Sequence, residues 1–129
     1  MVKTLAKTST FEIVEDDNKI IHITFFENYN IDESTAKDYV NVCLKLAGKE
    51  KHKILVDMRK VENVSLGAKK KMFDPRMVDI TTAAAILVQI QSPLVAVGVS
   101  FLLSLSQSPF PTKFFKTEQE AIEWLNGIE

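Results

Sequence analysis

Residues 80–112, with the sequence ITTAAAILVQIQSPLVAVGVSFLLSLSQSPFPT, contain no Asp, Glu, Lys or Arg, although charged residues make up 26% of the 129-residue chain. Segments this free of charge are usually buried in a core, pressed against a partner or placed in a membrane. A membrane-spanning helix needs about 20 consecutive apolar residues. Polar residues and a proline at 89–93 divide this stretch into two shorter halves. We therefore expect no membrane span.

The two halves predict a buried strand followed by an apolar helix. Residues 83–90 have the length of a strand, and residues 94–105 have the length of a helix. Ser92 can cap this helix, and Pro93 suits its first turn. A helix that is apolar nearly all round is buried in a core or covers something else. Because complete burial is hard to arrange in so short a chain, we expect part of the helix to meet a second subunit, a partner or a ligand.

The length and composition are typical of one globular domain with a single core. The chain has one cysteine, Cys43, so an internal disulfide is impossible. The N-terminus lacks the apolar segment of a signal peptide, and we therefore expect a cytoplasmic location. Residues 1–9, with two lysines and three Thr or Ser, indicate a flexible leader. Residues 10–129 are expected to form the domain.

The net charge of −1 hides an uneven distribution of charge along the chain. Residues 45–76 contain ten Lys or Arg and four Asp or Glu, and the remainder is acidic. A basic region can mark a site for an acidic partner or a nucleic acid, although it is more often a solvated face. The whole chain is not basic and has no base-stacking motif, so we expect no nucleic-acid binding.

The N-terminal half predicts a hairpin, a helix and a buried strand. Apolar residues alternate from Phe11 and again over 19–26, with a polar turn between them, as in two antiparallel strands. Asp32 as the N-cap and Gly48 as the residue after the last turn bound a helix. The short apolar run at 54–58 is typical of a central strand buried on both faces.

The C-terminal half continues this alternation. A helical segment over 66–80 is interrupted at Pro75, where Asp74 can cap a fresh start. After the charge-free stretch, residues 113–116 predict a short strand. The T-x-x-E capping box at 117–120 then begins a final helix. Strands that alternate with helices after an opening hairpin predict an α/β fold with a mixed, largely parallel sheet.

Catalytic and metal-binding motifs are nearly absent from the sequence. No nucleophile or carboxylate is spaced to work with His22, so we expect a packed or half-exposed strand histidine there. His52 lies in a lysine-rich loop and is expected to be solvated. Neither histidine has metal-ligand spacing with Cys43, which fits a small core residue. The four glycines are too scattered to cradle a phosphate. We therefore expect no metal, no cofactor and no enzymatic activity.

Asp57 and Ser65 are the best polar candidates for a site. Asp57 lies at the end of the buried strand, and sites in open α/β sheets gather beyond the carboxyl ends of strands. Ser65 opens the next helix. The alternative is structural: Asp57 pairs with Arg59 or a lysine, and Ser65 is an N-cap.

Two segments resemble the STAS or SpoIIAA-like family of small bacterial domains. They are ILVDMRKV at 54–61 and PTKFFKTEQEAIEWL at 111–125, and the resemblance extends over most of the chain from Phe11 onward. It implies a mixed sheet of four to five strands with helices mainly on one face. It also implies a non-enzymatic role in protein–protein signalling or ligand sensing.

The resemblance bears on one regulatory mechanism. Anti-sigma-factor antagonists of the same superfamily are controlled by phosphorylation of a serine just after an Asp-Leu-Ser-like strand end. Asp57-Met58-Arg59 resembles that strand end. Continued without gaps, the phosphoserine position falls on Leu66, and Ser65 precedes it by one residue. The resemblance therefore implies Asp57 and Ser65 as regulatory candidates.

We expect the domain to act by association, as a homodimer or with a protein partner. Gly98 within the predicted helix costs roughly 1 kcal/mol relative to Ala, so the close approach of another backbone or a ligand would explain it. The expected interface consists of Leu94, Val97, Gly98, Phe101, Leu102, Leu105 and Phe110. The alternative is a small binding protein for an apolar ligand or lipid, with the charge-free stretch, Met72, Phe73 and Met77 lining a pocket.

Overall fold

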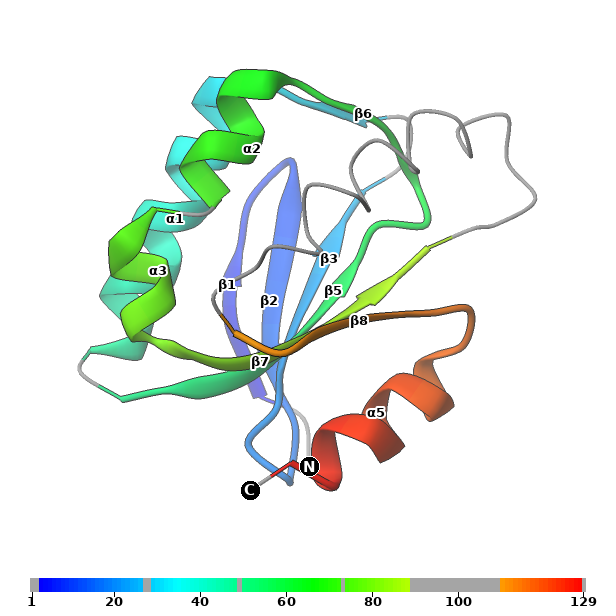
Figure 1. Cartoon of the computed structure of the whole chain (residues 1–129). Helices are drawn as coiled ribbons and strands as arrows, with labels where there is room; N and C mark the ends of the chain where they lie inside the picture. The colour runs from blue at the N-terminus through cyan, green and yellow to red at the C-terminus, as the bar shows by residue number, and fades with distance from the viewer. Residues whose placement is uncertain (1–2, 27–28, 49, 73, 89–109, 129) are drawn as a thin grey trace.

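The computed structural model describes residues 3–26, 29–48, 50–72, 74–88 and 110–128. Its main sheet has six strands: β1 (Lys3–Lys7), β2 (Phe11–Glu15), β3 (Ile21–Phe25), β5 (His52–Asp57), β7 (Thr81–Leu87) and β8 (Thr112–Phe115). They lie in the order β1-β2-β3-β5-β7-β8 (Figure 1). The first three strands are antiparallel, and β3, β5, β7 and β8 are parallel. The mixed sheet predicted from the sequence is thus confirmed.

Six strands correct the expected number of four to five. The additional strand is β1, which pairs with β2 at the edge of the sheet, where a flexible leader was expected. Its sequence KTLAK has only two apolar residues, Leu5 and Ala6, and both pack against the main core. An edge strand pairs with one neighbouring strand only, and β1 buries few apolar side chains. Its apolar pattern in the sequence is therefore weak.

Two short strands were also absent from the prediction. They are β4 (Tyr29–Ile31) and β6 (Val61–Val64), which form a separate parallel pair. The pair joins the segment that follows β3 to the segment that follows β5. Strands this short are stabilised by their tertiary partner more than by their own sequence.

The turn between β2 and β3 is built on Asp16. One carboxylate oxygen of Asp16 accepts hydrogen bonds from the backbone N–H groups of Asn18 (2.8 Å) and Ile20 (3.0 Å). Lys19 has a positive φ of 64°, which closes the turn. Asx turns of this kind explain why Asp and Asn are common in the turns of hairpins. The predicted polar turn is confirmed.

The structure describes four helices: α1 (Glu33–Ala47), α2 (Leu66–Met72), α3 (Pro75–Asp79) and α5 (Glu118–Asn126). Asp32 caps α1 by accepting a hydrogen bond from Thr35 N–H at 2.8 Å, and α1 ends at Gly48, where φ is 62°. Asp74 caps α3, so the predicted break at Pro75 is present. Among the described helices, none has the length and apolar character that crossing a membrane requires.

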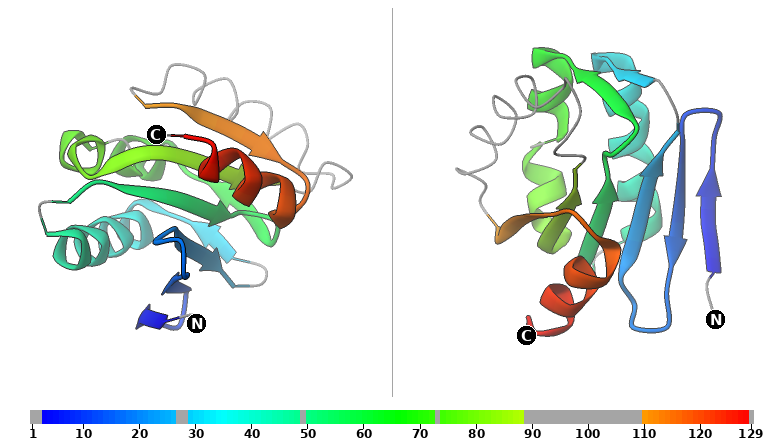
Figure 2. Two further views of the ribbon diagram at one scale, coloured as in Figure 1. Left: turned by 90° about the horizontal axis from the view of Figure 1, so that it is seen from below. Right: turned by 90° about the vertical axis from the view of Figure 1, so that its right-hand side faces the viewer.

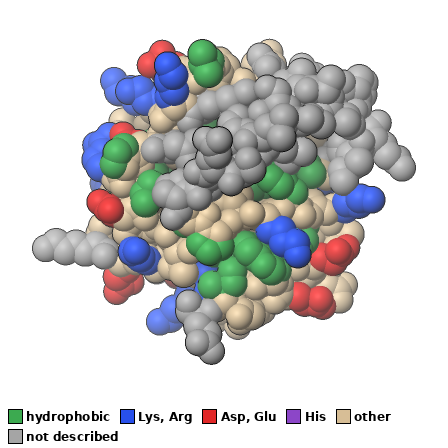
Figure 3. Space-filling view, in the orientation of Figure 1, with side chains coloured by type: hydrophobic (Ala, Val, Ile, Leu, Met, Phe, Trp, Pro, Cys, Tyr) green, Lys and Arg blue, Asp and Glu red, His purple; other side chains and the backbone are tan. Residues whose placement is uncertain are grey.

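Each face of the sheet has its own core. Most of the helical structure, from α1 to α3, lies on one face, which agrees with helices mainly on one side, and α5 covers part of the other (Figure 2). Ala83 and Ala85 of β7 are fully buried beneath Ala121 and Leu125 of α5. Because Ala121 of α5 and the alanines of β7 have small side chains, the helix can pack close to the sheet. Figure 3 shows hydrophobic side chains gathered over β8, with a basic side chain among them.

Candidate functional site

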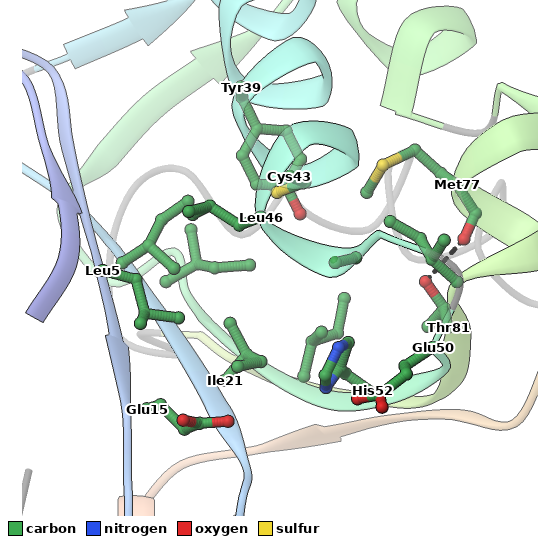
Figure 4. Close-up of a pocket in the computed structure, with 15 residues that line it drawn as sticks. Leu5, Glu15, Ile21, Tyr39, Cys43, Leu46, Glu50, His52, Met77 and Thr81 are labelled. Carbon is green, nitrogen blue, oxygen red and sulfur yellow. Dashed lines mark hydrogen bonds between the residues drawn. The ribbon is translucent and has the colours of Figure 1, made fainter. Parts of the chain in front are cut away.

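A cavity of about 210 Å³ lies between α1 and the sheet (Figure 4). Its apolar walls come from four strands and two helices. The strands contribute Leu5 of β1, Ile13 of β2, Ile21 and Ile23 of β3, and Ile54 of β5. The helical side contributes Leu46 and Ala47 of α1, Met77 of α3, and Ile80, which follows α3. Antiparallel strands, parallel strands and helices therefore all contribute to one apolar pocket.

The interior of the pocket is electrically neutral. Burial raises the pKa of the Cys43 thiol to about 12 and raises the pKa of the Tyr39 phenol well above its ordinary value. Both side chains are therefore protonated at neutral pH. Tyr39 is held in place by Phe11 and Phe25, whose ring centroids lie 6.0 and 5.7 Å from its own. A buried thiol with so high a pKa is a poor nucleophile, in line with the small core residue expected from the sequence.

Polar side chains of the pocket lie at its edge. Glu15, Glu50 and His52 line it, with Glu50 exposed and the other two half-buried. Thr81 also lines the pocket, but its hydroxyl donates to the backbone carbonyl of Met77 at 2.7 Å (Figure 4). Small-molecule sites commonly combine apolar walls with a few polar groups of this kind. His52, expected to be merely solvated, is thus part of a pocket.

The pocket lies at the amino ends of the parallel strands. Its lining includes the first residues of β3, β5 and β7, namely Ile21, His52 and Thr81. The sequence argument favoured the opposite edge, where Asp57 ends β5. At that edge, the segments that follow β3 and β5 form the paired strands β4 and β6. Segments in these positions often build a site, but here they pair with each other.

Asp57 is engaged in a local ion pair. Its two carboxylate oxygens accept hydrogen bonds from Arg59 Nε at 3.0 Å and Arg59 Nη2 at 2.8 Å. The backbone N–H of Arg59 donates to the same carboxylate at 3.1 Å. Asp57 raises the pKa of the guanidinium in turn. The structural alternative predicted for Asp57 is the one observed.

Ser65 has the position of a helix cap. Its hydroxyl oxygen accepts a hydrogen bond from Ala68 N–H at 3.1 Å, and its own N–H donates to the carbonyl of Ile31 at 2.9 Å. The Glu33 side chain lies against Gly67, with an oxygen 3.0 Å from where a β-carbon would stand. A regulatory role for Asp57 or Ser65 stays a prediction.

His22 differs from the prediction because carboxylates do surround it. Its Nε2 lies 2.8 Å from Asp16 Oδ2, and its Nδ1 lies 3.5 Å from Glu118 Oε1. The turn brings Asp16 back over the strand, and α5 brings Glu118 from the other end of the chain. No group of three or more His, Cys, Asp or Glu in the described part of the chain is arranged to hold a metal ion.

Most of the expected interface lies outside the described residues. This applies to Leu94, Val97, Gly98, Phe101, Leu102 and Leu105. Phe110 is described, half-buried, and lines a second cavity of about 40 Å³ together with Met58 and Met72. Of the methionines and phenylalanine expected in a pocket, Met77 lines both cavities, Met72 lines the smaller one, and Phe73 is not described.

The arrangement of strands and helices defines the class of fold. It is similar to the crystal structure of an uncharacterised protein of the DUF3478 family from Shewanella loihica PV-4, which has a SpoIIAA-like fold. That likeness has a TM-score of 0.65 at 15% identity and covers 97% of this chain and 95% of the other. The chain therefore has a SpoIIAA-like fold, as the resemblance implied. It belongs to the family described as domain of unknown function DUF7793, whose model matches residues 13–129.

A protein of unknown function from Arthrobacter sp. FB24 is 25% identical over 93% of this chain and 95% of its own, with a TM-score of 0.36. No curated protein matches the chain.

Proposed function

We propose that this SpoIIAA-like domain is a non-enzymatic binding protein that takes a small apolar molecule into the pocket beneath α1. The observation that carries the proposal is an apolar cavity of about 210 Å³ that is lined from several elements. Engineered apolar cavities of about 150 Å³ remain dry and bind benzene. A pocket somewhat larger than that suits a molecule with one ring or a short chain.

The chemistry of the lining supports binding in preference to catalysis. The buried Cys43 thiol and Tyr39 phenol are protonated at neutral pH, so neither is poised as a nucleophile or base. Asp57, the best polar candidate from the sequence, is occupied by Arg59. Apolar walls with a polar edge bind by removing apolar surface from water, at about 25 cal/mol per Å².

The test is a titration with indole, which is small, neutral and largely apolar. We expect saturable binding, with methyl NMR signals of Ile13, Ile21 and Ile54 shifting together and the thermal midpoint rising as indole is added. Ala47→Phe, which places a ring in the pocket, should weaken binding at least tenfold. Asn41→Phe adds the same ring on the exposed side of α1 and serves as the control. Equal binding by the two variants, or no saturable binding at all, would contradict the proposal.

A second candidate function is self-association, favoured by the absence of charge over residues 80–112. Native mass spectrometry of the freshly purified protein should then give twice the chain mass. Val97→Glu should reduce the assembly to monomers without unfolding it, because a carboxylate is costly in an apolar interface. A wild-type monomer would exclude this function, and a mass increment of bound small molecule would favour the first candidate.

A further inference from the structure

Two acidic side chains, Glu15 and Glu50, lie at the edge of the pocket. Several carboxylates are matched by a cationic or imidazole partner: Asp16 by His22, Asp57 by Arg59, and Asp74 by Arg76. Within the described part of the chain, Glu15 and Glu50 form no ion pair. Lys3 stands opposite Glu15 in the register of β1 and β2, and the two do not form an ion pair either. Two uncompensated negative charges therefore border a neutral apolar pocket.

These two carboxylates approach the pocket from different sides. Glu15 ends β2, whereas Glu50 lies in the loop between α1 and β5, and Figure 4 shows them on opposite sides of the lining with His52 beside Glu50. A group bound at the edge would therefore meet acceptor oxygens from two directions. An anionic group would be repelled by both carboxylates, and a neutral hydroxyl would gain hydrogen bonds without charge attraction.

We propose that the pocket binds a small cationic amphiphile, with its apolar body among Ile13, Ile54 and Met77 and its protonated amine between Glu15 and Glu50. This inference rests on the proposed binding of an apolar molecule and specifies the charge of that molecule. An alkyl ammonium group has a pKa near that of lysine, about 10.4, and is cationic at neutral pH. The occupant is thus apolar at one end and positively charged at the other.

Three probes of nearly equal size separate the contributions of charge and apolar surface: 2-phenylethylamine, 2-phenylethanol and phenylacetate. Titration calorimetry at low ionic strength should give the order amine, alcohol, acid from tightest to weakest. Two ion pairs with these solvent-accessible carboxylates predict a preference of about twofold to thirtyfold for the amine over the alcohol. Raising the salt concentration should reduce that preference and leave the affinity for the alcohol nearly unchanged.

Paired variants identify the groups responsible. Glu15→Gln with Glu50→Gln should abolish the preference for the amine while retaining the affinity for the alcohol. The matched control, Glu12→Gln with Glu123→Gln, removes the same charge from residues that do not line the pocket and should retain the preference. Equal affinities of the wild type for amine and acid, or an unchanged preference in the Glu15/Glu50 variant, would overturn the cationic inference while the pocket function stands. Failure of all three probes to bind the wild type would overturn both.

Discussion

His22 lies between Asp16 and Glu118, which join it from a turn and from the last helix. Sequence spacing indicated a packed or half-exposed strand histidine with no carboxylate at hand. The face of the strand on which His22 lies was predictable from period-two alternation. Its partners were not, because one depends on the way a turn folds back and the other on where a distant helix docks.

The pH dependence of stability should report on Asp16. Burial would raise the pKa of Asp16, but hydrogen bonds from His22 and from the backbone of Ile20 and Asn18 lower it below its ordinary value of 3.8. A carboxyl group with a lowered pKa stabilises the folded state above its unfolded-state pKa, and the contribution is lost as pH falls through the folded-state pKa. Asp16→Asn should therefore cost about 1 kcal/mol in free energy of unfolding at pH 7.

The same contribution should vanish in acid. Urea unfolding between pH 7 and pH 2.5 should show the wild type and Asp16→Asn converging in stability at pH values below about 3.8. Asp38→Asn, at an exposed site on α1, is the control and should follow the wild type throughout. A constant gap between the wild type and Asp16→Asn down to pH 2.5 would show that the charge of Asp16 is not what stabilises the fold.

At the scale of elements, the ends of helices were predictable where a capping residue marks them. Asp32, Gly48, Asp74 and Thr117 each occupy the capping position that their residue types indicated. β1, β4 and β6 were missed because their stability comes from a neighbouring strand, which no local pattern records. The pocket was anticipated only in part, because Met77, Ile80 and Thr81 are its only described lining residues in the segments expected to line one. The other lining residues are mostly members of the larger core, and no sequence pattern separates core residues that border a cavity from those that do not.

The capping box of α5 should have a measurable effect on stability. The Thr117 hydroxyl oxygen accepts from Glu120 N–H at 3.3 Å, and the hydroxyl lies 3.0 Å from the Glu120 carboxylate. Thr117→Ala should cost about 1 kcal/mol, since it removes the N-cap, whereas Thr117→Ser should cost much less. Urea unfolding followed by Trp124 fluorescence monitors this helix directly, because the Trp124 ring packs 5.7 Å from that of Phe115. Equal losses in the two variants would mean that the cap is unimportant.

At the scale of the whole molecule, one sheet separates two cores of unequal size. The larger core involves β1, β2, β3, α1, α2 and α3, and the smaller one joins α5 to β5 and β7. The sequence predicted this class of architecture, since alternating strands and helices leave few other arrangements. The sequence did not indicate that the pocket would lie in the larger core and that the C-terminal helix would pack in the smaller one.

The smaller core should be sensitive to loss of volume. Leu125 is fully buried against the alanines of β7, so Leu125→Ala should lower the free energy of unfolding by about 3 kcal/mol. Leu66, with 69% of its surface exposed, offers the same substitution at a site outside both cores, and Leu66→Ala should stay within about 0.5 kcal/mol of the wild type. Chemical denaturation of both variants measures the difference, and similar losses would show that α5 is held weakly.

All residues that line the larger pocket lie between Leu5 and Thr81, so they precede the last 48 residues of the chain. Chains are synthesised from the N-terminus at about 5–20 residues per second. Adding the 48 residues that follow Thr81 in this sequence takes about 2–10 s, so every lining residue is synthesised before β8 and α5. Among the described elements, neither β8 nor α5 contributes a lining residue, so the walls of the pocket do not depend on contacts with those two elements. A ligand that binds as proposed would then stabilise the fold before β8 and α5 are made, and the hairpin of β2 and β3, whose contacts are local, is expected to form first.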